Sequence, residues 1–275
     1  MKIGFHRKQL AEIVKRLGLR MPQVQLLLAQ ERYLERLVLV DHKRSLIWKG
    51  GSLLLRRYSS IQPPRFTTDL DLLVRGTTIS DALELIKKAT DQNIDDGFSF
   101  SFVKITPMKR DTPYGGERIE LAWNFENKSN SEPLRIDLCA GDDVDSVNIK
   151  LDELFLEHPL QTSLSIEVYP SEFIFAEKLE TLVRFGTGNT RLKDFIDLWT
   201  LAQNKLDSKK LSSAIIRCFK RRDSKLNPSY WEEVLSDKEL SVILEEARKR
   251  NYPSLNIPSV DKIFKELAEF LRRIL

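Results

Sequence analysis

Asp69 and Asp71 are the residues whose types and spacing most directly suggest chemistry. They alternate with Leu70 and Leu72, and alternate residues of a strand point to the same face, so the two carboxylates are expected side by side. Two carboxylates held together repel each other and lose hydration. A magnesium ion would relieve this cost, because it takes oxygen ligands and keeps waters and substrate phosphates in its other positions. The pair therefore predicts a site for a divalent cation.

A Gly-Gly-Ser sequence stands shortly before this pair, at Gly50, Gly51 and Ser52. Glycines let backbone amides approach an anion closely, and the start of a helix offers unpaired N–H groups at the positive end of its dipole. Ser52 adds a hydroxyl group. We interpret the three residues as a phosphate-binding turn ahead of a helix, with a plain helix start after a strand as the alternative.

A third acid, Asp137, lies in the short apolar strand predicted at residues 134–139. A charged residue facing inward on such a strand is costly unless it serves a site. Asp137 is therefore expected to face the same cavity as Asp69 and Asp71, where it would bind metal or the attacking hydroxyl. Asp142, Asp143 and Asp145 follow in a loop-like stretch and are interpreted as solvated turn carboxylates.

The elements that must position these residues follow from hydrophobic periodicity and from turn and cap signals. Strands are expected at 70–74, 98–105, 118–125, 134–139 and 164–168. Helices are expected twice within 7–46 and at 52–58, 80–89, 172–185, 192–203, 208–219, 237–249 and 260–274. The order predicts an α+β fold with a mixed or antiparallel sheet, formed by residues 1–168, followed by a helical C-terminal domain, residues 169–275.

Composition narrows the class of protein. With 275 residues, 41% of them hydrophobic, the chain can bury a substantial core, and a formal charge of +4 is only mildly basic. No run of about 18 apolar residues is present and no signal peptide is recognisable, so we expect a cytoplasmic protein without a membrane partner. Two widely separated cysteines predict neither a disulfide framework nor a zinc site. Basic residues gather near Lys220, Arg221 and Arg222, either as a solvated helix face or as a contact surface for nucleic acid.

In this order the motifs resemble the nucleotidyltransferase-fold toxins of the AbiEii/AbiGii type, which are relatives of the mycobacterial nucleotidyltransferase toxins. The resemblance covers roughly residues 30 to 200 and is specific in its combination, not in any single piece. It departs from the family in one detail, since Ser52 and Leu53 stand where Thr-Ala often follows the two glycines. The motifs that carry it are Trp48-Lys49-Gly50-Gly51-Ser52-Leu53-Leu54, Arg65-Phe66-Thr67-Thr68-Asp69-Leu70-Asp71, Ile136-Asp137-Leu138, Glu177-Lys178-Leu179 with Arg184, and Lys193-Asp194-Phe195-Ile196-Asp197-Leu198.

The resemblance implies a nucleotidyltransferase fold, a Mg²⁺ or Mn²⁺ cofactor, and a toxin of a type IV toxin–antitoxin or phage-defence system. It implies that the glycine-serine turn and the aspartate pair form the metal-nucleotide site, that Lys178 and Asp194 take part in catalysis, and that Lys178 and Arg184 contact the nucleotide. In physical terms, Lys178 would neutralise the charge that develops on the leaving pyrophosphate. Lys193 and Asp197 lie four residues apart, and a local ion pair is expected between them.

The function predicted from the sequence is transfer of a nucleoside monophosphate from Mg-NTP to a hydroxyl of an acceptor. Among relatives tRNA is the best-supported acceptor class, and for RNA the contacts would come from Lys220, Arg221 and Arg222. A cognate antitoxin is a further expected partner. Two alternatives stay open: transfer to a side-chain hydroxyl of a protein, and nucleotide binding without turnover.

Overall fold

The computed structural model describes residues 7–58, 65–108, 115–126, 128–130, 132–141, 144–161, 163–252 and 257–275. The loop expected at 59–64 lies outside these ranges. By their internal contacts the residues form two compact units. The first comprises residues 1–57 and 66–169, and the second comprises 58–65 and 170–275.

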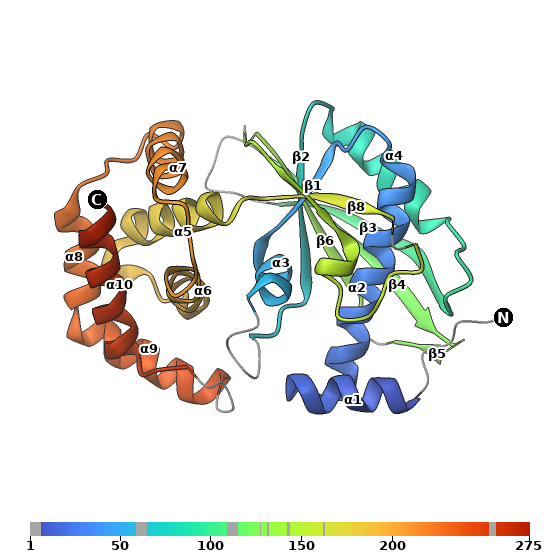
Figure 1. Ribbon diagram of the computed structural model, residues 1–275, viewed down its shortest axis with the longest axis horizontal. Coiled ribbons are helices and arrows are strands. Elements are labelled where there is room, and N and C mark those ends of the chain that lie inside the picture. Colours follow the sequence, from blue (N-terminus) through green and yellow to red (C-terminus); the bar gives the residue numbers. More distant parts are fainter. Residues whose placement is uncertain are drawn as a thin grey trace. The chain divides into compact units, whose positions relative to one another are not determined.

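The first unit contains a mixed sheet and the helices packed on it (Figure 1). In the described residues the strand order is β3-β4-β6-β2-β1-β8-β7, and β5 pairs with β4. Its elements are α1 (Arg7–Leu17), α2 (Met21–Val40), β1 (Leu46–Lys49), α3 (Gly50–Arg57), β2 (Asp69–Val74), α4 (Ile79–Thr90), β3 (Phe98–Met108), β4 (Gly116–Phe125), β5 (Lys128–Ser129), β6 (Leu134–Ala140), β7 (Val147–Lys150), the 3-10 turn Leu151–Glu153 and β8 (Ser165–Val168).

The second unit is helical in its described part, shown in yellow to red in Figure 1. Its elements are α5 (Ser171–Phe185), the 3-10 turn Gly186–Gly188, α6 (Leu192–Ala202), α7 (Ser208–Arg221), α8 (Pro228–Ser236), α9 (Lys238–Asn251) and α10 (Val260–Ile274). Together the two units confirm the predicted α+β fold with a mixed sheet and a helical C-terminal region. None of the described helices combines the length and the apolar character that crossing a bilayer requires.

The first four residues of β2 alternate between half-buried and buried side chains, as the sequence predicts, whereas Leu73 and Val74 are both buried. Leu70 and Leu72 of β2 are fully buried, and so are Ile136 and Leu138 of the neighbouring β6. Helices α2 and α4 pack against β6 and against each other, which closes the core of this unit. The residues between these leucines and isoleucines, including Asp71, point to the opposite face of the sheet.

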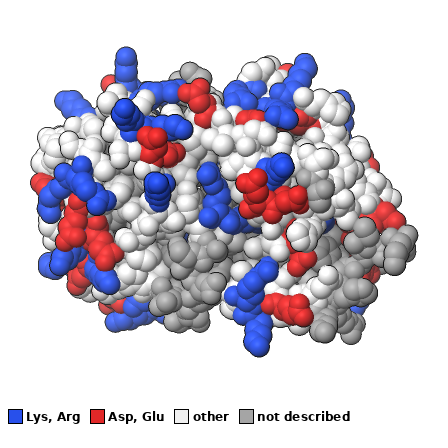
Figure 2. All heavy atoms as spheres, in the orientation of Figure 1, with Lys and Arg blue, Asp and Glu red and all other residues white. Residues whose placement is uncertain are grey.

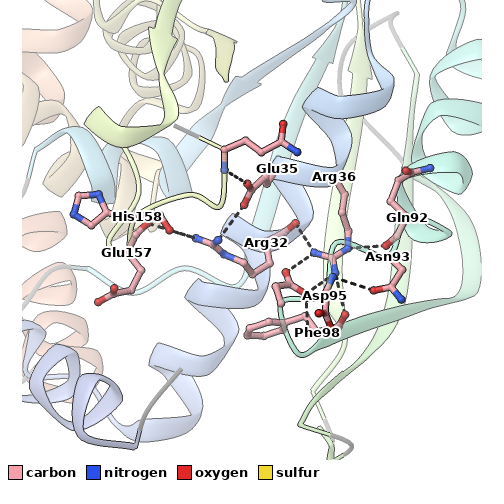
Figure 3. A network of polar contacts seen from close by, with 11 residues as sticks. Arg32, Glu35, Arg36, Gln92, Asn93, Asp95, Phe98, Glu157 and His158 are labelled. Atoms are coloured by element: carbon pink, nitrogen blue, oxygen red, sulfur yellow. Dashed lines mark hydrogen bonds and ion pairs between the residues drawn. The ribbon is translucent and has the colours of Figure 1, made fainter. Parts of the chain in front are cut away.

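Buried charges tie α2 to the rest of the first unit (Figure 3). Arg36 makes two hydrogen bonds of 2.7 Å to the carboxylate of Asp96 and a third, of 3.0 Å, to the carbonyl of Gln92. Arg32 donates to Glu35 at 3.0 Å. All four charged side chains are almost completely buried, so each needs its partner to offset the loss of hydration. The network fixes how α2 lies relative to the segment that follows α4.

Both cysteines, Cys139 and Cys218, are buried and not joined by a disulfide, as expected from their spacing.

Candidate active site

Three carboxylates share one face of the sheet where β2 and β6 run in parallel. Asp71 is paired in register with Asp137. Asp69 lies two residues before Asp71 on the same strand and so points to the same face. In-register neighbours on parallel strands point to the same side, so the expected common face of the three acids is confirmed. Asp69 and Asp71 are half-buried, and Asp137 is buried.

An arginine from the next strand neutralises part of this charge. Arg118 of β4 is paired in register with Asp137 and donates to both of its oxygens, at 2.7 and 2.8 Å. Its Nη2 also lies 3.9 Å from Oδ2 of Asp69. The hydrogen bonds to Asp137 raise the pKa of Arg118, so the guanidinium stays charged. Sequence reasoning missed Arg118, because spacing in the sequence does not show that β4 lies beside β6 and two strands from Asp69.

The arrangement limits which acids fit a metal ion. Within the described residues, no group of three or more His, Cys, Asp or Glu side chains is arranged to hold one. Because Asp137 is taken up by Arg118, the prediction that Asp137 is a third metal ligand has no support in this arrangement. Asp69 and Asp71 remain on one strand face, partly accessible, and two carboxylates suffice for a magnesium ion that also binds substrate phosphates.

Gly50 sits directly against the aspartate pair. Its φ of +77° is one that side-chain-bearing residues rarely adopt, and a Cβ atom built there would lie 1.9 Å from Oδ2 of Asp71. Lys49, the residue before it, is the register partner of Asp71 on the antiparallel strands β1 and β2. The glycine pair forms the first turn of α3 and not, as expected, a turn ahead of the helix. A glycine is therefore required at position 50 for two reasons: the positive φ and the closeness of the Asp71 carboxylate.

Ser52 does not occupy the position that the sequence suggested. Its side chain is fully buried, and its hydroxyl accepts a hydrogen bond of 2.8 Å from the indole N–H of Trp48. The expected contact between this hydroxyl and a phosphate is therefore not supported, because no phosphate can reach a fully buried oxygen. Ser52 instead helps to pack α3 against β1. Of the other loop acids, Asp145 is exposed, as expected, whereas Asp142 and Asp143 lie outside the described residues.

A second group of charges lies inside the helical unit. Lys178 of α5 donates to Oδ1 of Asp194 at 2.9 Å, and its ammonium lies 2.8 Å from Oδ2 of Asp197. Arg65 makes a bidentate pair with Asp197, at 2.8 and 2.9 Å. The expected pair between Lys193 and Asp197 was wrong: among the described residues the exposed Lys193 makes no ion pair, and Asp197 points to Arg65 and Lys178.

Electrostatics in this group favours the charged forms. Burial alone would lower the pKa of Lys178, but the carboxylates of Asp197 and Asp194 outweigh it and raise that pKa. Burial alone would raise the pKa of Asp197, but Arg65 and Lys178 outweigh it and lower that pKa. Sequence reasoning found Lys178 and Asp194 through the family motif and missed the pairing of Arg65, which is 132 residues away from its partner.

The remaining predicted contacts lie on α5 and α7. Arg184 is exposed, with its guanidinium 3.4 Å from Glu180 and stacked over the ring of Phe185. Arg222 donates to the fully buried Glu180 at 2.7 Å, and although burial alone would lower the pKa of Arg222, Glu177 and Glu180 raise it. Arg222 is thus tied to α5, and its role in binding the acceptor stays a prediction.

Lys220 and Arg221, the two other residues of that prediction, lie in the last turn of α7. Lys220 is exposed and Arg221 half-buried.

Two solved structures from Helicobacter pylori are similar to the chain. JHP933 is 18% identical, with a TM-score of 0.44, over 90% of this chain and 91% of its own. A protein described as a nucleotidyltransferase is 16% identical, with a TM-score of 0.36, over 90% and 93%. No curated protein matches the chain.

The family model described as "Nucleotidyl transferase AbiEii toxin, Type IV TA system" matches residues 32–270. This range includes the acids of the sheet with Arg118, and also the group formed by Lys178, Asp194, Asp197 and Arg65. Since the match spans most of the 275 residues, the chain belongs to the AbiEii nucleotidyl transferase toxin family of type IV toxin–antitoxin systems.

Proposed function

We propose that this protein transfers a nucleoside monophosphate from a nucleoside triphosphate to a hydroxyl group of an RNA and releases pyrophosphate. Membership of a nucleotidyl transferase toxin family supports the reaction class. The observation that carries the proposal is the common sheet face of Asp69, Asp71 and Asp137, with Gly50 pressed against Asp71. In-line displacement at phosphorus needs positioned charges more than covalent catalysis, and this face supplies them.

Asp69 and Asp71 are the residues that would hold Mg²⁺ or Mn²⁺. A divalent cation there would neutralise phosphate charge and orient the triphosphate for attack. Arg118 neutralises the charge of Asp137 and lies close to Asp69. Asp137 thereby holds Arg118 beside Asp69. The backbone amides of Gly50 and Gly51, in the first turn of α3, are candidates for hydrogen bonds to phosphate oxygens.

Lys178 would supply positive charge for the pyrophosphate as it leaves, with Asp194 as its partner. An ammonium group that is already held in place gains most when charge builds up on the bridging oxygen in the transition state. Arg184, exposed on the same helix α5, is a candidate for a further phosphate contact. These roles rest on the family motif and on the charges found within the helical unit.

RNA, with tRNA as the leading class, is the acceptor that the helical unit favours. Helix α7 carries Lys209, Lys210, Arg217, Lys220 and Arg221 and no acidic residue. Such a helix can contact successive phosphates without reading sequence. On the face drawn in Figure 2, Lys and Arg are interspersed with Asp and Glu. We therefore expect local contacts with α7, not a field over the whole surface, to bind the acceptor.

The family also supports a biological setting: a toxin acting in the cytoplasm, whose effect a cognate antitoxin counteracts, in a system that can serve phage defence.

The test is to incubate the protein with each radiolabelled NTP, Mg²⁺ and either total RNA or total protein. Label in RNA together with released pyrophosphate is the expected result, and Asp71→Asn is the matched inactive control. Label in protein and none in RNA would refute the RNA acceptor and favour modification of a side-chain hydroxyl. NTP binding without any transfer or pyrophosphate release would refute the enzymatic proposal and leave a nucleotide-binding module.

A further inference from the structure

The ammonium group of Lys178 is held between two carboxylates of one helix. Asp194 and Asp197 lie three residues apart on α6, so both face α5, from which Lys178 projects. The two contacts measure 2.9 Å to Asp194 and 2.8 Å to Asp197. Only 16% of the lysine side chain is exposed. A lysine has a long, flexible stem, so a defined position for its charge requires contacts of this kind.

Arg65 adds a second layer to this arrangement. Its Nε and Nη2 donate to the two oxygens of Asp197, at 2.8 and 2.9 Å. Both side chains are largely buried, 11% and 6% exposed. A bidentate pair between guanidinium and carboxylate fixes the plane of the carboxylate as well as its position. Asp197 therefore presents one oriented oxygen, Oδ2, to Lys178.

We infer that Arg65 and Asp197 are positioning residues, in which Arg65 orients the carboxylate of Asp197 and Asp197, together with Asp194, fixes the ammonium group of Lys178. This inference rests on the catalytic role proposed for Lys178. Neither residue needs to touch the nucleotide for the effect. An ammonium group that must stabilise developing charge works best when its position is fixed before the reaction.

A purely stabilising role explains this group poorly. Buried ion pairs lose so much hydration that well-packed apolar residues of similar volume often serve stability equally well. Here Lys178, Arg65 and two aspartates are buried together between helices of the second unit. The pKa of Lys178 is raised and that of Asp197 lowered, in agreement with charged partners. Buried groups of charges occur in structural networks, as on α2, as well as at functional sites, and this group is distinguished by containing Lys178, the lysine of the family motif.

Arg65→Lys is the deciding variant, because it keeps the positive charge and removes the bidentate geometry. Arg248→Lys is the matched control, since Arg248 makes a similar bidentate pair with Glu245, at 2.9 and 2.6 Å, within the same unit. Two readouts are compared. One is the separation of kcat from KM for the NTP. The other is the rate at which the amine of Lys178 is methylated in the protein without NTP, measured by peptide mass spectrometry.

The expected result for Arg65→Lys is a fall in kcat of about tenfold with KM changed by less than about threefold. Methylation of Lys178 should become about threefold faster, because the amine is less firmly held. Asp197→Asn should act in the same direction, and the double variant should be no worse than Asp197→Asn alone, since the two residues act as a unit. If Asp197→Asn does not fold, Arg65→Lys alone decides.

Values of kcat and of the methylation rate for Arg65→Lys that match those of Arg248→Lys would overturn the inference. Lys178→Ala separates this failure from failure of the proposed function. Faster methylation of Lys178 in Arg65→Lys, combined with normal turnover of Lys178→Ala, would uphold the positioning and refute the catalytic role of the lysine. A loss of kcat that merely follows the fraction of unfolded protein, with methylation of all lysines raised alike, would also overturn the inference.

Discussion

Gly50→Ala should disable the active site through a single methyl group. The added Cβ would lie 1.9 Å from Oδ2, 2.6 Å from Cγ and 2.8 Å from Cβ of Asp71. Ordinary contacts between such atoms are about 3.5 Å, so the carboxylate must move by about 1.5 Å. A displacement of about 1 Å at a reacting group costs about 100-fold in rate. We therefore expect turnover to fall by about two orders of magnitude.

Backbone strain must be separated from this clash, and Gly76 provides the control. Gly50 and Gly76 have similar φ values, +77° and +67°, but a Cβ at Gly76 meets nothing within 4 Å. Each alanine should cost about 1–2 kcal/mol of stability from the left-handed backbone. Gly76→Ala should therefore lower the melting temperature without affecting turnover.

The assay measures kcat with saturating NTP and acceptor, and Mn²⁺ affinity by titration calorimetry, for both variants at a temperature where both are folded. Gly50→Ala should lose turnover and bind Mn²⁺ more weakly, because Asp71 is displaced. If Gly50→Ala matched Gly76→Ala in both quantities, the carboxylate of Asp71 would not be the functional group that Gly50 positions.

Four further outcomes are expected. Asp71→Asn should reduce transfer by about 100-fold or more, while thermal melting without metal shows unchanged or higher stability because one repulsion is relieved. Arg118→Gln should make the melting temperature depend more strongly on Mn²⁺ than in the unmodified protein, since the acids lose their built-in cation; an equal Mn²⁺ response would contradict this. Lys178→Ala should lower kcat by about 100-fold with NTP affinity nearly unchanged, and equal losses in steady-state kinetics would indicate a phosphate anchor. Replacing Lys220 and Arg221 together by alanine should weaken RNA binding and flatten its salt dependence by about 0.7–0.9 per lost phosphate contact, as measured by filter binding at several salt concentrations; an unchanged slope would remove α7 as the acceptor surface.

The sequence was informative wherever local periodicity decides the structure. The alternation around Asp69 and Asp71 correctly placed the aspartates on one face and the leucines in the core. Helix α4 was also expected, at 80–89, and it begins one residue earlier, after the N-cap Thr78, which forms a capping box with Asp81. Both results follow from interactions between residues close in the chain.

Elements with weaker local signals were missed. Strand β1 has only four residues and follows a long helical pattern, yet Asp41 ends α2 by accepting hydrogen bonds from the backbone amides of Ser45 and Leu46. Helix α8 was missed despite a usable signal, an Asn227 cap followed by Pro228 in the first turn. The Asn227 cap with Pro228 is enough to predict α8, whereas the Asp41 cap marks only where α2 ends.

The pairings at the site depend on tertiary structure and could not be predicted. Arg118 reaches Asp137 only because β4 and β6 are antiparallel neighbours in one particular register. Arg65 reaches Asp197 across 132 residues of the chain. Sequence spacing carries neither fact, since it reports faces of elements and not which elements become neighbours.

Arg65 stands in sequence between the two stretches of the first unit, yet its side chain pairs with Asp197 of the second. No single cut can therefore divide this protein into two intact halves. A fragment beginning at residue 170 would contain Lys178 and Asp197 but not Arg65. The buried carboxylate of Asp197 would then lack its bidentate partner. Arg65 and the helices from α5 onward should for this reason be expressed as parts of one chain.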